Sequence, residues 1–98
     1  MLIRIVRMTF KEDQVENFLT IFNQNKDKIR HFEGCTHLSL LRDYTSPHIF
    51  TTYSHWKDEK ALDKYRHSPL FKKVWANTKI YFGDRPIAFS LKKYLDVD

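Results

Sequence analysis

Hydrophobic residues recur along this chain with two spacings, and these spacings predict where its strands and helices lie. Residues 2–10 are rich in isoleucine, valine, methionine and phenylalanine, which is typical of a β-strand. Apolar residues at helical spacing then predict a first helix over about residues 12–32. Two strand-like segments follow, residues 36–42 and 49–56. The turn-forming residues 43–47 between them indicate an antiparallel hairpin.

The ends of the first helix have local sequence signals. Thr9 and Glu12 have the spacing of a capping box, although Lys11 or Asp13 is equally suited to mark the start. Gly34 is expected to adopt the left-handed conformation that stops a helix. These signals place the helix between the first strand and the hairpin.

A second helical region begins near Asp58 and is predicted to break in its middle. Ser68 followed by Pro69 is an N-cap residue with proline at the first helical position, which predicts a restart there. Apolar residues continue at helical spacing until residues 83–86, and residues 87–95 are the last predicted strand. The order βαββαβ predicts an α+β, ferredoxin-like fold with one antiparallel sheet and two helices on one face.

Both faces of the predicted sheet are apolar, whereas a half-exposed sheet alternates apolar and polar residues. Ile3 and Ile5 fall on one side of the first strand, opposite a second apolar set: Leu2, Val6, Met8 and Phe10. The same face of a second copy would cover the face without helices and give a homodimer, a dimeric α+β barrel. The alternative is a face that tolerates scattered exposed apolar residues.

Length and composition predict a single folded domain over residues 1–98. The hydrophobic fraction of 42%, with eight phenylalanines, five tyrosines and two tryptophans, favours a packed globule. The lone cysteine, Cys35, excludes an internal disulfide and fits a small buried residue in a reducing compartment. No segment approaches membrane-spanning length. We therefore expect a soluble, cytoplasmic protein without membrane contact.

The net charge of +5 is spread along the chain, because basic residues alternate with acidic ones. This interleaving favours a solvated surface over a nucleic-acid partner. The nearest approach to a basic patch is a set of five lysines: Lys72, Lys73, Lys79, Lys92 and Lys93. Solvation and anion binding both stay open for it.

Several common cofactor motifs are missing from the sequence. Gly34 and Gly83 are the only glycines, so a glycine-rich phosphate loop or dinucleotide fingerprint is excluded. The histidines have no ligand-like local spacing: His31, His37, His48, His55 and His67. We therefore expect neither a metal nor a cofactor. His48 and His55 face opposite sides of one strand, and His37 joins either side depending on the hairpin register.

The order and spacing of several short segments resemble one family along nearly the whole chain. The segments are residues 32–35, residues 42–47 with Phe50 after them, residues 56–62 and residues 68–71. Together they resemble the antibiotic biosynthesis monooxygenase (ABM) family. The resemblance implies a dimeric α+β barrel. It also implies either oxygenation of polycyclic phenols or quinols without metal or flavin, or oxidative breakdown of haem.

The chain departs from this family at positions that matter for chemistry. Many members have histidine nine positions after the tryptophan that matches Trp56, whereas this chain has Tyr65, with His67 two residues later. Haem-degrading members have tryptophan where Tyr65 stands, histidine at Trp75 and asparagine near Val6. Trp75 has no ligand atom for iron, so axial haem binding in that manner is not expected.

An aromatic cleft between helix and sheet is predicted from four rings: Trp56, Tyr65, Phe71 and Trp75. Such a cleft suits stacking on a flat organic molecule. The alternative is that these rings are simply core, because aromatic residues at helical spacing usually are.

A cofactor-free oxygenase needs a base to ionise its substrate and polar donors to hold the resulting anion. The candidate bases are three histidines: His37, His55 and His67. The candidate donors are Tyr65, Thr52 and Ser54, and Trp56 and Trp75 would shape the cavity. Distances between them do not follow from the sequence.

Three classes of function fit these observations. The first is a small monooxygenase acting on a quinol-like or polyketide-like aromatic. The second is a binding or stress-related dimer that keeps the fold without the chemistry. The third is an RNA-binding module, because the RNA recognition motif shares the βαββαβ order. Residues 48–54 lack the glycine and the aromatic spacing of that motif, which disfavours this class.

Overall fold

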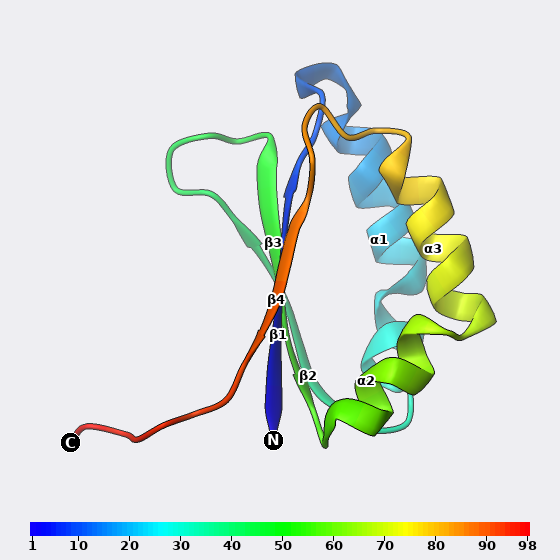
Figure 1. Cartoon of the computed structure of the whole chain (residues 1–98). Helices are drawn as coiled ribbons and strands as arrows, with labels where there is room; N and C mark the ends of the chain where they lie inside the picture. Colours follow the sequence, from blue (N-terminus) through cyan, green and yellow to red (C-terminus); the bar gives the residue numbers. More distant parts are fainter.

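Four strands form one antiparallel sheet in the computed structural model, which describes residues 1–98 (Figure 1). The central strands are β1 (Leu2–Thr9) and β3 (Ile49–Trp56), and the edge strands are β2 (Cys35–Arg42) and β4 (Ile87–Leu91). The strand order is β2-β3-β1-β4, and every neighbouring pair is antiparallel. The predicted ferredoxin-like α+β fold is confirmed.

All the helices lie against one face of this sheet (Figure 1). The first helical segment is a short 3-10 turn, Glu12–Gln14, which leads into α1 (Val15–Arg30). The second is divided into α2 (Glu59–Arg66) and α3 (Pro69–Lys79). None of the helices has the length and apolarity needed to span a lipid bilayer.

Local capping explains where the second helical segment starts and where it breaks. The Asp58 carboxylate accepts a hydrogen bond from the backbone N–H of Ala61 at 2.8 Å. The Ser68 hydroxyl accepts one from the N–H of Phe71 at 3.1 Å, and Pro69 occupies the first turn of α3. Both bonds satisfy N–H groups that a helix start leaves free, so the predicted break at Ser68 is confirmed.

The ends of the first helix differ from the prediction. Neither Lys11 nor Gln14 caps with its side chain, and Thr9 belongs to β1, so the capping box does not form. The helix ends at Arg30, not at residue 32, because the chain turns earlier to reach β2. Gly34 has the predicted left-handed conformation, with φ of 90°.

The last strand is shorter than predicted, because it ends at Leu91. Leu91 pairs with Ile3 near the first residue of β1, so almost no partner strand remains for residues 92–95 to extend the ladder. Residues 92–98 are exposed and lead away from the sheet on the side without helices (Figure 1).

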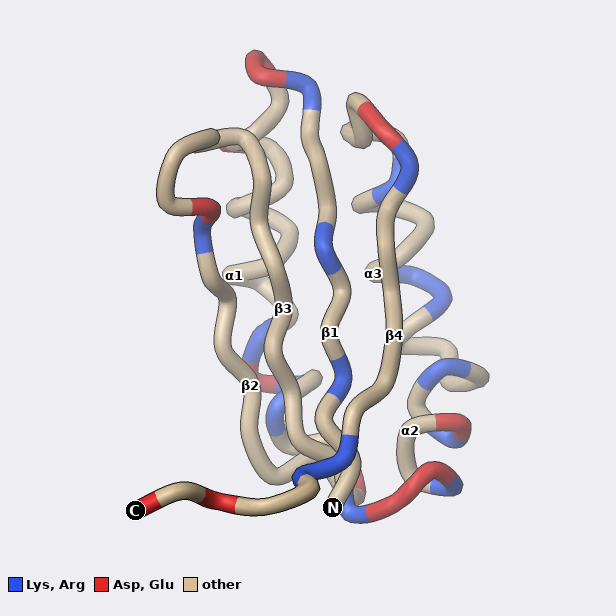
Figure 2. The backbone as a smooth tube through the Cα atoms, turned by 60° about the vertical axis from the view of Figure 1, so that its left-hand side comes forward, with Lys and Arg blue, Asp and Glu red and all other residues tan.

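The sheet has one covered face and one open face. We call the side away from the helices the open face. The register places on it Ile3, Ile5, Arg7, His37, Ser39, Leu41, Thr51, Tyr53, His55, Ile87, Phe89 and Leu91. No other element of the chain covers this face, and Figure 2, which looks onto it, shows few charged positions along the strands. Phe89 is 44% exposed there and Leu91 50%.

The covered face contains the core, which consists of two groups of buried side chains. One group is Met8, Phe10, Val15, Phe18 and Phe50. The other is Ile29, Cys35, Trp56, Leu62 and Tyr65. Members of both groups border the same cavity, so the core is divided around an internal space.

Candidate functional site

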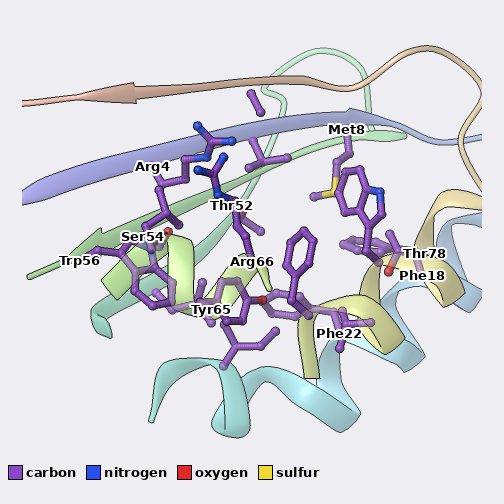
Figure 3. A pocket seen from close by; sticks show the side chains of 18 residues that line it. Arg4, Met8, Phe18, Phe22, Thr52, Ser54, Trp56, Tyr65, Arg66 and Thr78 are labelled. Carbon is purple, nitrogen blue, oxygen red and sulfur yellow. Dashed lines mark hydrogen bonds between the residues drawn. The ribbon is translucent and has the colours of Figure 1, made fainter. Parts of the chain in front are cut away.

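A cavity of about 360 Å³ lies between the sheet and the helices (Figure 3). Of the 18 residues that line it, 13 are hydrophobic. They are Arg4, Val6, Met8, Phe18, Phe22, Ile29, Leu38, Thr52, Ser54, Trp56, Leu62, Tyr65, Arg66, Phe71, Val74, Trp75, Thr78 and Ala88. A cavity of this size and lining suits a small organic molecule.

Four aromatic rings form a continuous row along the cavity. Trp56 stacks on Tyr65, with ring centroids 4.9 Å apart and planes at 27°. Tyr65 meets the edge of Phe71 at 5.2 Å, and Phe71 stacks on Trp75 at 5.8 Å. The structure therefore brings together the four rings predicted to form the cleft. Trp56 and Tyr65 are also buried core residues, so the cleft and the core interpretations both hold for them.

The polar groups predicted to act as donors also reach the cavity. Thr52 and Ser54 lie on β3 with side chains toward the helices, and both line the cavity. The indole N–H of Trp56 donates to the Ser54 hydroxyl at 2.9 Å, which leaves the Ser54 O–H free to donate.

Tyr65 is a protonated donor at this site. Burial raises the pKa of the Tyr65 hydroxyl well above its ordinary range, and the nearby Cys35 raises it further. The hydroxyl oxygen lies among the side chains that line the cavity (Figure 3). Tyr65 can therefore donate a hydrogen bond to a ligand oxygen, but it is not a base near neutral pH.

Two arginines, which the sequence interpretation missed, also line the cavity. Arg4 comes from β1 and Arg66 from the last turn of α2 (Figure 3). Burial lowers the pKa of the Arg4 guanidinium, and the charge of Arg66 lowers it further. The alternation of side chains along a strand could have revealed Arg4. Its position places it on the same side of the first strand as Val6 and Met8.

His37 and His55 lie on the open face of the sheet, so the sheet separates them from the cavity. Their ring centroids are 5.0 Å apart, and Tyr53 contacts both rings. A nitrogen of His55 is hydrogen bonded to the Tyr53 hydroxyl at 3.0 Å. Desolvation lowers the pKa of His55, and His37 and Lys93 lower it further.

His67 is exposed at the C-terminal end of α2, where its ring nitrogen lies 2.7 Å from the backbone oxygen of Asp63. None of the three candidate bases lines the cavity. The sequence interpretation combined these histidines with the aromatic cleft, whereas the tertiary structure places them elsewhere. A catalytic role for any of them stays a prediction.

The protein has no cluster of metal ligands and one buried cysteine. Nowhere in the chain do three His, Cys, Asp or Glu side chains gather closely enough to hold a metal ion. Cys35 is buried, as predicted, and burial raises the pKa of its thiol. A neutral thiol is a poor nucleophile, so Cys35 is a structural residue.

The fold and the cavity define a small α+β domain with a ligand-sized, aromatic-lined space under its helices. The family model described as antibiotic biosynthesis monooxygenase matches residues 1–77, most of the chain. The chain belongs to the antibiotic biosynthesis monooxygenase family.

Solved structures share this fold at low sequence identity. A structure of an antibiotic biosynthesis monooxygenase has a TM-score of 0.91 at 19% identity, over 97% of this chain and 100% of that chain. A conserved protein from Methanosarcina mazei Go1 has a TM-score of 0.88 at 23% identity, over 95% and 93%. Rv0793 from Mycobacterium tuberculosis has a TM-score of 0.88 at 15% identity, over 99% and 98%. No curated protein sequence matches the chain.

Proposed function

We propose that the protein is a cofactor-independent monooxygenase that acts on a small aromatic molecule, quinol-like or polyketide-like. The observation that supports this proposal is the cavity, with its volume of about 360 Å³ and its row of four rings. Flat aromatic molecules stack on such rings, and the apolar walls exclude water from a reactive intermediate. Membership of the family supports oxygenation as the chemistry.

The reaction needs no reductant when the substrate supplies all the electrons. For anthrone, the ring methylene loses two hydrogens and gains one oxygen atom from O₂, which gives anthraquinone. The second oxygen atom of O₂ takes the two hydrogens and leaves as water. Four electrons pass from the substrate to O₂, and every atom is accounted for.

The cavity residues would bind the substrate and hold its anion. Enolates and phenolates reduce O₂ more readily than their neutral forms, so the ionised substrate is the reactive species. The hydroxyls of Tyr65, Ser54 and Thr52 can donate to its oxygen, which stabilises the anion. No histidine lines the cavity, so the substrate would ionise in solution and enter the cavity as an anion.

The test is oxygen uptake by purified, metal-free protein with anthrone under ¹⁸O₂. We expect uptake above the rate without protein, and anthraquinone that contains one ¹⁸O atom. Val74→Trp fills the cavity and should reduce the rate to background, because Val74 lines it. The matched control is Ala76→Trp, an exposed position on the same helix, which should keep the rate.

Alanine variants of the three histidines test the roles predicted from the sequence. In a reaction confined to the cavity, His37→Ala, His55→Ala and His67→Ala should each keep the rate. A loss of about 10²- to 10⁴-fold in one of them would identify it as the base and contradict the cavity mechanism. If neither anthrone nor menadiol is oxidised above background, the monooxygenase proposal fails.

A second candidate is a domain that binds an aromatic ligand without transforming it. It is favoured by the absence of His, Asp, Glu, Lys and Cys from the cavity lining, together with the protonated state of Tyr65. This candidate predicts that anthrone binds with a defined stoichiometry and oxidises no faster than in buffer. Val74→Trp would then abolish binding and leave oxygen uptake unchanged.

A further inference from the structure

Arg4 and Arg66 line the cavity from opposite walls, and we call them the arginine pair. Arg4 lies on the helix-facing side of β1, where the register places Ser54 and Ser90 beside it. One terminal nitrogen of Arg4 donates to the Ser90 hydroxyl at 3.1 Å. A guanidinium has five N–H donors, so most of the Arg4 donors remain for another acceptor.

Arg66 also has a donor without an acceptor. Its Nη2 is paired with the carboxylate of Asp63, one turn earlier on α2. Its Nε is buried and has no hydrogen-bond partner within the protein. Leaving a buried donor unsatisfied is unfavourable, so the Arg66 guanidinium gains from any further acceptor that its terminal N–H groups meet in the cavity.

The charges around the cavity are unbalanced. The lining contains two arginines and no acidic residue. Asp63 is paired with Arg66 but does not line the cavity, so the arginine pair with Asp63 has a net charge of +1. Like charges repel more strongly in a poorly solvated space than in water, and a bound anion would remove this repulsion.

We propose that the arginine pair binds the anionic oxygens of a flat aromatic ligand, such as a carboxylate or an ionised hydroxyl group. This inference deepens the proposed function, since it assumes that the cavity is the ligand site and assigns the ligand's charge. It also gives the cavity a way to favour an ionised substrate without a histidine beside it.

The geometry of the cavity fits such a ligand. A carboxylate has two oxygens, and these can accept from the free N–H groups of Arg4 and from the terminal N–H groups of Arg66. Figure 3 shows the arginine pair together at one end, beside Trp56 and Tyr65. The other end is lined by side chains such as Met8 and Phe18, which suits an uncharged ring system. The ligand would therefore lie with its anionic group between the arginines and its rings along the aromatic row.

The test compares two probes that differ only in charge. Isothermal titration calorimetry with 2-naphthoate and with neutral 2-naphthamide measures how much the anion contributes. We expect 2-naphthoate to bind about tenfold more tightly or better, as for hydrogen bonds to charged groups. In a second arm, the absorbance of bound 2-naphthol should show ionisation at lower pH than in free solution. Such a shift would show that the site binds an ionised hydroxyl group as well as a carboxylate.

Substitutions in the arginine pair should remove this preference. Arg66→Gln and Arg4→Gln should bring the two naphthalene probes to within about twofold of each other. The matched control is Arg7→Gln, which removes the same charge from the same strand on the open face and should keep the preference. Circular dichroism checks folding, and Arg66→Gln decides the question if Arg4→Gln does not fold.

Equal binding of the two probes by the unmodified protein would overturn the inference. So would an unchanged preference in Arg66→Gln, or an equal loss of preference in Arg7→Gln. These binding results are independent of turnover. Tight 2-naphthoate binding without anthrone oxidation would reject the monooxygenase proposal and support the anion site. Anthrone oxidation with equal binding of the two probes would support the monooxygenase proposal and reject the anion site.

Discussion

Gly34 is the residue that joins α1 to the hairpin, and its backbone admits almost no side chain. Its φ of 90° is a conformation that residues with a Cβ rarely adopt. A Cβ added there would also lie 2.4 Å from the Cβ of Ala61 on α2. The glycine therefore allows both the turn and the close approach of α2, the helix that brings Tyr65 and Arg66 to the cavity.

We expect Gly34→Ala to destabilise the protein by about 1–3 kcal/mol from backbone strain, with a further cost from the contact with Ala61. The free energy of unfolding in urea measures the loss. In an Ala61→Gly background the contact is relieved, so the added cost of Gly34→Ala should fall while the strain remains. Ala61→Gly alone controls for the lower helix propensity of glycine. An unfolding free energy equal to that of the unmodified protein would show that the turn can rearrange.

At the scale of elements, the break between α2 and α3 shapes the cavity. Ser68 accepts from the N–H of Phe71 and donates to the backbone oxygen of Tyr65 at 2.6 Å. One side chain thus connects the end of α2 to the start of α3. Because Tyr65 precedes the break and Phe71 follows it, the break sets the contact between these two rings.

We expect Ser68→Ala to lower the free energy of unfolding by about 1–2 kcal/mol, because it removes a cap and leaves a partly buried N–H without an acceptor. The same variant should bind 2-naphthoate more weakly, since the two rings lose their fixed relation. Urea unfolding and calorimetry measure the two effects. Thr45→Ala, in the exposed hairpin loop, is the control and should change neither quantity. A stable Ser68→Ala variant with full binding would show that Pro69 alone defines the break.

At the scale of the whole molecule, we propose that the open face is covered by the same face of a second copy. Its apolar residues extend across three strands, and Ile87, Phe89 and Leu91 are 44–51% exposed there. No element of the chain covers them (Figure 1). Exposed apolar patches of this kind mark interaction surfaces, and a two-fold pair of sheets closes both at once.

We expect light scattering to give a mass near twice the 11.9 kDa of one chain at micromolar concentration. A stable dimer of this kind buries more than about 1,000 Å² in total. Tyr53→Asp places a charge on the open face and should unfold the protein instead of producing a stable monomer. The control is Ala76→Asp on the exposed side of α3, which should leave the mass and stability unchanged. A mass near 11.9 kDa for the unmodified protein would reject the dimer.

Features that depend on neighbouring residues could be predicted from the amino-acid sequence alone. The periods of apolar residues located all four strands and both helical segments, because each period reflects the geometry of a single element. Ser68 with Pro69 and Gly34 marked a helix break and a left-handed turn, because capping and backbone conformation are local. The end of the first helix and the length of β4 did not follow from local patterns, since they depend on where the chain must go next.

Which chemical groups meet in space depends on long-range packing. The aromatic row was predicted as a group, because its members share the helical and strand faces that form a core. The register of β2 against β3 placed His37 with His55 on the open face, and a pairing register depends on hydrogen bonds between distant segments. The meeting of Arg4 with Arg66 required α2 to pack against β3, the neighbour of β1 in the sheet, a long-range contact that no local pattern encodes.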